Sequence, residues 1–133
     1  MSVEKFVDQV LSAARKFRWI KRHKVEATIA WASIRLWLNE SFVDVFYRKK
    51  TGNISYAYIE SGKRLFGANN MRIGWHLHPF GEIERHIPTK PITIEEYVQV
   101  LKQQLDKHSM GQLFTRFDSL SWGQRIYLIM CCV

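Results

Sequence analysis

The segment GWHLHPFGEIERH, residues 74–86, contains three of the five histidines of the chain. His76 and His78 are two residues apart, so on a β-strand their side chains would project from the same face, about 7 Å apart. His86 follows a turn and could fold back toward them. Imidazoles gathered in this way can bind zinc or another divalent metal ion. A metal site formed by His76, His78 and His86 is therefore one hypothesis.

A second hypothesis needs no metal. RNA carries its own nucleophile, so an enzyme that cuts it needs only a base, an acid and a cation near the phosphate. The three histidines titrate near neutral pH and could be the catalytic acid and base. Nearby guanidinium groups match the geometry of phosphate; the candidates are Arg64, Arg72 and Arg85. The third alternative is that the histidines end a strand and only bond to backbone groups.

The overall charge favours a polyanionic partner. The 133 residues include 20 Lys and Arg against 12 Asp and Glu, a formal net charge of +8. Such a balance attracts RNA or another nucleic acid. Hydrophobic residues make up 47% of the chain, enough for a folded core. No phosphate-binding glycine loop, dinucleotide fingerprint or nucleophile elbow occurs, which argues against ATP hydrolysis, dinucleotide chemistry and serine hydrolysis.

We expect a cytoplasmic location. The first residues are amphipathic and carry acidic groups, unlike a signal peptide. The chain contains no run of eighteen apolar residues, so no membrane span is expected. The two cysteines, Cys131 and Cys132, are adjacent, so we expect free thiols in a reducing compartment. A zinc site on this pair would lack the usual ligand spacing.

Two helices are predicted to flank a sheet. Residues 1–18 place apolar side chains at helical spacing, with Ser2 as the N-cap. Residues 93–107 form the second helix, which begins with a capping box made by Thr93 and Glu96. Its apolar stripe is expected to pack on one face of the sheet.

The sheet is predicted over residues 26–78, as an antiparallel meander of four or five strands. Short turns that contain glycine separate its strands. The basic segment RWIKRHK before it is expected to be a loop. Aromatic residues at strand spacing could stack on bases, although such residues are more often core; they are Tyr56, Tyr58, Trp75 and Phe80. Asn69 and Asn70 could orient a ligand or form a turn.

The apolar tail, residues 108–133, could hold a short helix and a final strand, or could form a homodimer surface. With no linker or repeat, residues 1–133 are expected to be one α+β domain.

Two segments together resemble the TumE-like toxin family of prokaryotic toxin–antitoxin systems, over about residues 27–105. Arg64, Phe66, Asn69 and Asn70 lie near the position of one family motif, and His76, His78, Pro79 and His86 lie near its histidine-rich segment. Asn69 replaces an acidic residue of the pattern, and His-Leu-His replaces an adjacent histidine pair. The resemblance implies an antiparallel sheet with flanking helices and an antitoxin protein as partner.

The sequence therefore favours a small basic protein that acts on RNA, as a toxin-like ribonuclease that uses the histidine cluster. The alternative is a non-catalytic module that binds nucleic acid or protein and dimerises through its apolar C-terminus.

Overall fold

A computed structural model describes residues 1–109, which form an α+β fold with two helices and a seven-stranded antiparallel sheet. The predicted fold class is confirmed, whereas the prediction of four or five strands was wrong. Most of the predicted tail, with Cys131 and Cys132, lies outside the described residues. In chain order the elements are α1 (Val3–Ala14), β1 (Arg22–Ala27), β2 (Trp31–Trp37), β3 (Phe42–Arg48), β4 (Asn53–Glu60), β5 (Lys63–Asn69), β6 (His76–His78), β7 (Ile87–Pro88) and α2 (Ile94–Ser109).

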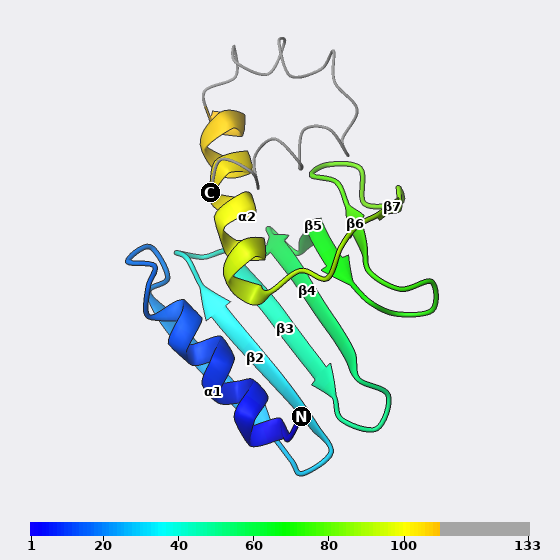
Figure 1. The fold of residues 1–133 in the computed structure, drawn as a ribbon. Coiled ribbons are helices and arrows are strands. Elements are labelled where there is room, and N and C mark those ends of the chain that lie inside the picture. Colours follow the sequence, from blue (N-terminus) through cyan, green and yellow to red (C-terminus); the bar gives the residue numbers. More distant parts are fainter. Residues whose placement is uncertain (110–133) are drawn as a thin grey trace.

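The strands follow one another across the sheet in the order in which they occur in the chain (Figure 1). Every neighbouring pair is antiparallel. A meander of this kind needs only short connections, as the glycine-containing turns predicted. Gly52 and Gly62 hold φ angles of 71° and 76° in these turns, a region that favours glycine.

The last three residues of the basic segment predicted to be a loop instead begin β1, whereas residues 18–21 lie outside helix and strand as predicted. Residues 22–27 pair with β2, and all but Val25 are exposed. An edge strand that is open on both faces can carry charges throughout, and charged edges discourage pairing with other chains. Because β1 shows no apolar alternation, a pattern search could not find it.

A turn follows β1 at residues 28–30. The Thr28 side chain accepts hydrogen bonds from the backbone N–H groups of Ala30 and Trp31, at 3.0 and 3.2 Å. This turn separates β1 from β2. At the other end of the sheet, β7 has only two residues, too few to show any periodicity.

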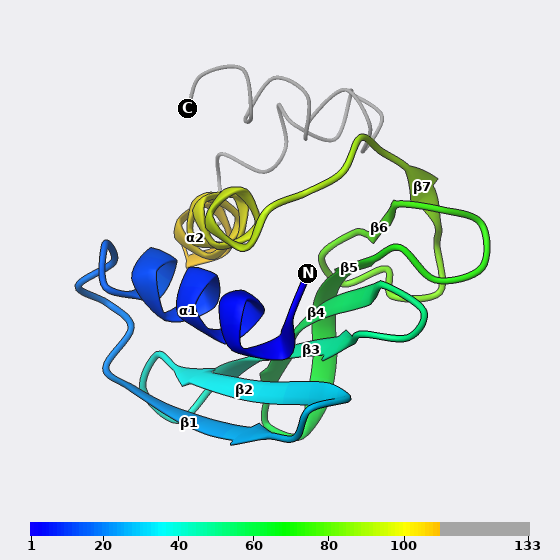
Figure 2. The same cartoon turned by 60° about the horizontal axis from the view of Figure 1, so that its bottom comes forward.

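Both helices cover the same face of the sheet (Figure 2). α1 packs on β2 and β3, and α2 packs on β4 and α1. Alternate residues of each central strand are buried beneath the helices. Tyr97 of α2 lies at the centre of this core and donates a 2.8 Å hydrogen bond to the carbonyl oxygen of Phe66. Within residues 1–109, no helix covers the opposite face, which we call the helix-free face.

The predicted helix starts are confirmed by hydrogen bonds. The Ser2 side chain accepts from the backbone N–H of Lys5 at 3.0 Å. Thr93 accepts from the N–H of Glu96 at 3.1 Å, and Glu96 accepts from the N–H of Thr93 at 3.0 Å. α1 ends at Ala14, four residues before the predicted end. Neither helix described in residues 1–109 combines the length and hydropathy needed to cross a membrane.

Replacing the capping threonine tests the capping box. Thr93→Ala is expected to lower the free energy of unfolding by about 1 kcal/mol, because an N–H at the helix start loses its acceptor. Glu96→Gln keeps a side-chain acceptor and is the matched control. Urea unfolding measures both variants. An unchanged midpoint for Thr93→Ala would show that the cap contributes nothing to stability.

Candidate metal centre

The register of the sheet places two of the three histidines on its helix-free face. In β6, Leu77 lies opposite Ala68 of β5, and both side chains are buried in the core. His76 and His78, on either side of Leu77, must therefore project from the other face. His76 lies opposite Asn69, and His78 lies opposite Gly67.

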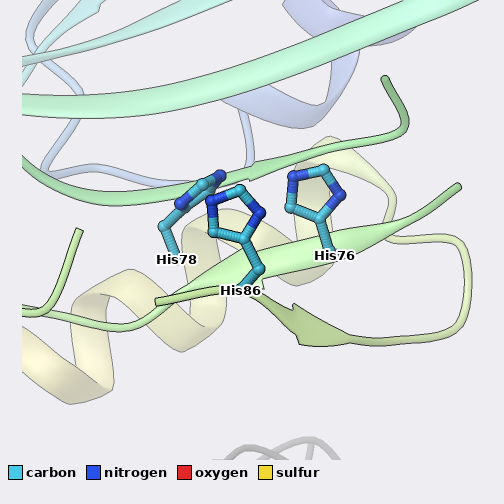
Figure 3. Close-up of side chains that lie close together, drawn as sticks. All are labelled: His76, His78 and His86. Carbon is cyan, nitrogen blue, oxygen red and sulfur yellow. The ribbon is translucent and has the colours of Figure 1, made fainter. Parts of the chain in front are cut away.

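The three imidazoles converge, as the sequence predicted (Figure 3). The ring centroids of His76 and His86 are 5.0 Å apart, with the rings nearly parallel at 2°. His78 meets the other two rings edge-on, at 5.0 Å from His76 and 4.5 Å from His86. One nitrogen from each ring lies within 4.8 Å of the others. His76 and His78 are each 4% exposed, whereas His86 is exposed and opens the cluster to solvent.

Backbone carbonyls orient the two buried rings. The Nδ1 atom of His76 lies 2.9 Å from the carbonyl oxygen of Gly74, and the Nδ1 atom of His78 lies 2.7 Å from that of Ile83. A carbonyl oxygen only accepts, so each Nδ1 must carry the proton. In the neutral ring this leaves the lone pair on Nε2. Histidines that bind metals commonly donate their other nitrogen in this way.

Asn69 supports the same assignment for His78. Its Oδ1 accepts a 3.0 Å hydrogen bond from the N–H of Met71, which directs its Nδ2 toward the His78 ring. That Nδ2 lies 3.4 Å from Nε2 of His78, a long hydrogen bond in which the amide donates. Asn69 therefore makes only a weak hydrogen bond to Nε2 of His78, the nitrogen whose lone pair could bind a ligand.

Gly67 provides the room for the His78 ring. A Cβ atom at this position would lie 3.3 Å from the carbonyl oxygen of Tyr56 and 3.8 Å from Cδ2 of His78. The approach to the Tyr56 carbonyl oxygen is tight, whereas the distance to the ring is ordinary van der Waals contact, so a side chain longer than that of alanine would be needed to displace the ring. The sequence analysis did not identify Gly67, because a glycine without a positive φ has no local signature.

The surroundings keep His78 neutral. Burial lowers the pKa of His78 below its ordinary value, and the charges of Arg64 and the two other histidines lower the pKa further. These effects outweigh the hydrogen bond to Ile83, which favours the protonated ring. At about pH 6.5, where an ordinary histidine is half protonated, His78 is therefore mostly neutral.

Nitrogen-15 NMR of the imidazole rings can test this arrangement. In metal-free protein at pH 7.5, we expect the neutral rings of His76 and His78 to carry their proton on Nδ1. His23, which is exposed on β1, is the control and should show exchange between both tautomers. A proton on Nε2 of His78 would contradict the assignment.

The three candidate arginines have different positions relative to the cluster. Arg64 on β5 is exposed, and its charge acts on His78. Arg85 directly precedes His86, and its guanidinium lies 3.8 Å from a carboxylate oxygen of Glu82. Arg72 is exposed in the loop before β6, where its φ angle is 62°. Arg64 is thus the candidate arginine whose charge acts on the cluster, whereas Arg85 adjoins His86 in the sequence and pairs with Glu82.

The aromatic residues singled out from the sequence belong to the core. Tyr56, Tyr58 and Phe80 are buried and are not free to stack on a base, whereas Trp75 is partly buried and packs against Tyr56, with ring centroids 5.9 Å apart. Asn70 makes turn contacts: its Oδ1 accepts from the N–H of Ile54 at 2.7 Å, and its Nδ2 donates to the carbonyl oxygen of Gly52 at 3.0 Å.

The donor set suits an ion of the zinc class. Three imidazole nitrogens leave a fourth tetrahedral position open, as in catalytic zinc sites. Zinc–nitrogen bonds are about 2.0–2.1 Å long, so the rings must draw together by about 1 Å when an ion binds. The exposed His86 is free to make that adjustment. His76, His78 and His86 therefore fit a divalent transition metal.

No protein-family model, curated protein or solved structure matches this chain. The resemblance to the TumE-like family stays a prediction.

Proposed function

We propose that the protein is a metal-dependent hydrolase that cleaves phosphodiester bonds in RNA. His76, His78 and His86 hold a divalent ion of the zinc class in this proposal. The observation that carries it is the convergence of three imidazoles, two of which donate Nδ1 to backbone carbonyls and keep Nε2 for a ligand. The net charge of +8 supports a polyanionic substrate.

The same geometry favours metal binding over metal-free acid–base catalysis. An acid and a base that act on one phosphodiester must stand on either side of it, each within hydrogen-bond reach. Here the ring centroids are 4.5 to 5.0 Å apart, so the imidazoles touch and leave no room for a phosphate between them. A single ion, in contrast, can bind between the three nitrogens once the rings draw together by about 1 Å.

An ion held there supplies Lewis acidity at a phosphoryl oxygen and a nucleophilic water near neutral pH. The protein supplies positioning. The carbonyl oxygens of Gly74 and Ile83 hold the two buried rings, and Gly67 leaves space for one of them. We assign Arg64 to hold the phosphate, because it is exposed and its charge acts on His78.

The test combines metal analysis with RNA digestion. Purified protein should contain about one equivalent of zinc-class metal and cut a single-stranded RNA. Chelation should abolish cleavage, and added zinc should restore it. His86→Ala should lose both metal and activity. His23→Ala removes an exposed histidine on β1 and is the matched control, with both properties unchanged.

Two results would contradict the proposal. Cleavage that persists after complete chelation would favour metal-free acid–base catalysis by the same histidines. Metal binding without cleavage would favour the non-catalytic binding module. The toxin role, the antitoxin partner and the homodimer through the C-terminal tail stay predictions, for which co-purification with the product of a neighbouring gene is the direct test.

A further inference from the structure

The helix-free face of the sheet carries more large apolar side chains than a solvent-exposed face usually does. Alternate residues of β2 and β3 lie on this face, and aromatic residues recur among them. They are Trp31, Trp37, Phe42 and Phe46. The Trp31 and Phe46 rings lie 6.4 Å apart, and the Trp37 and Phe42 rings lie 6.0 Å apart. All four are only partly buried. Open faces of antiparallel sheets are normally polar, so aromatics there point to a binding surface.

Arginines lie over these rings. The guanidinium carbon of Arg22 is 4.3 Å from the centre of the Trp37 ring. That of Arg35 is 3.8 Å from the centre of the Phe42 ring. Aromatic faces combined with guanidinium planes are the groups on which unpaired bases stack. The four residues Arg22, Arg35, Trp37 and Phe42, which we call the stacking patch, lie at neighbouring register positions.

The helix-free face carries an excess of positive charge. Lys24 pairs with Glu26 at 3.2 Å. Arg35 makes two hydrogen bonds to the carboxylate of Asp44, at 2.8 and 3.1 Å. Within residues 1–109, neither Arg22 nor Arg48 takes part in an ion pair. Two such faces would repel each other, whereas a polyanion would be attracted.

The sheet register connects the stacking patch to the histidines. Residues that lie directly opposite each other in antiparallel strands share a face. The row that begins at Arg35 crosses the sheet through Asp44, Ala57 and Gly67 and ends at His78. Ala57 on β4 and Gly67 on β5 are small, so no large side chain stands in this row between Asp44 and His78. From β3 to β6 it spans three strand spacings, about 14 Å, the rise of about four stacked nucleotides.

We infer that the stacking patch binds single-stranded RNA and leads the strand across Ala57 and Gly67 to the histidine cluster. The part of this inference that delivers the RNA for cleavage rests on the proposed function, whereas RNA binding to the stacking patch needs no metal. Single strands are favoured over duplexes because paired bases cannot leave their helix to stack on the guanidinium and aromatic groups of the stacking patch.

The experiment measures binding of a labelled twelve-residue oligouridylate to metal-free protein by fluorescence anisotropy. Trp37→Ala should weaken binding about tenfold or more, since base stacking on one aromatic ring has a large effect. Arg22→Gln should weaken it severalfold and reduce the salt dependence by about 0.7 in the log–log slope. Arg15→Gln removes the same charge from the exposed C-cap residue of α1, on the helix-covered side, and should bind like wild type.

Arg22 is exposed, so its variant keeps the test decisive if Trp37→Ala fails to fold. Equal affinity of Arg22→Gln and wild type, or a preference for duplex RNA, would overturn the inference. So would a dimer in solution that Trp37→Ala dissociates, because the face would then bind a second copy. RNA binding without cleavage would contradict only the proposed function. Zinc-dependent cleavage that neither Trp37→Ala nor Arg22→Gln affects would contradict only this inference.

Discussion

Zinc added to the metal-free protein raises its melting temperature, and the His86→Ala substitution removes most of that increase. A ligand that binds only the folded state stabilises it by about 2.7 kcal/mol when its concentration is 100 times its dissociation constant. For a protein of this size, that corresponds to a shift of about 10 °C. Differential scanning fluorimetry at several zinc concentrations measures the effect.

The choice of His86 separates metal binding from folding. His86 is exposed, so its removal should change the stability of the metal-free protein by less than about 0.5 kcal/mol. His76 and His78 are buried, and their loss would combine both effects. His23→Ala is the control and should keep the full zinc shift. If zinc left the wild-type melting temperature unchanged, the three histidines would not form a metal centre.

Tyr97→Ala is expected to lower the free energy of unfolding by about 3–5 kcal/mol. The Tyr97 side chain is 1% exposed. It packs between the rings of Tyr56 and Phe66, each with its centroid 5.1 Å away. Truncation would leave a large cavity between α2 and the sheet. It would also leave the carbonyl oxygen of Phe66 without its side-chain donor.

Tyr97→Phe divides this effect into its parts. It keeps the ring and removes only the hydroxyl, so we expect a loss of about 1–2 kcal/mol. Gln99→Ala, at a partly exposed position of α2, should change stability by less than about 0.5 kcal/mol. Urea unfolding followed by circular dichroism measures all three. A Tyr97→Ala variant as stable as Tyr97→Phe would show that the ring contributes little to the core.

The convergence of the histidines could be predicted because it depends on local rules. Two residues separated by one share a face of a strand, and the turn before His86 returns the chain toward them. What orients the rings could not be predicted. The acceptors are the carbonyl oxygens of Gly74 and Ile83, and every residue has such a group, so no residue type marks them.

The number of strands was predicted wrongly because two strands of the sheet show no apolar pattern. β1 is an exposed charged edge, and β7 is a two-residue strand, so neither alternates between apolar and polar. The central strands, each with one face against the helices, alternate clearly and were predicted. The stacking patch could not be predicted from the sequence, because only the register shows which face of the sheet Trp37 and Phe42 occupy.

The neighbour-by-neighbour strand order also determines when the histidine cluster can exist during protein synthesis. Each hairpin can close as soon as its second strand leaves the ribosome, because it requires no later part of the chain. His76 and His78 lie on the sixth strand, and His86 directly precedes the seventh. A nascent chain can therefore pair most of its strands before it contains all three imidazoles, whereas α2, which completes the core, follows later.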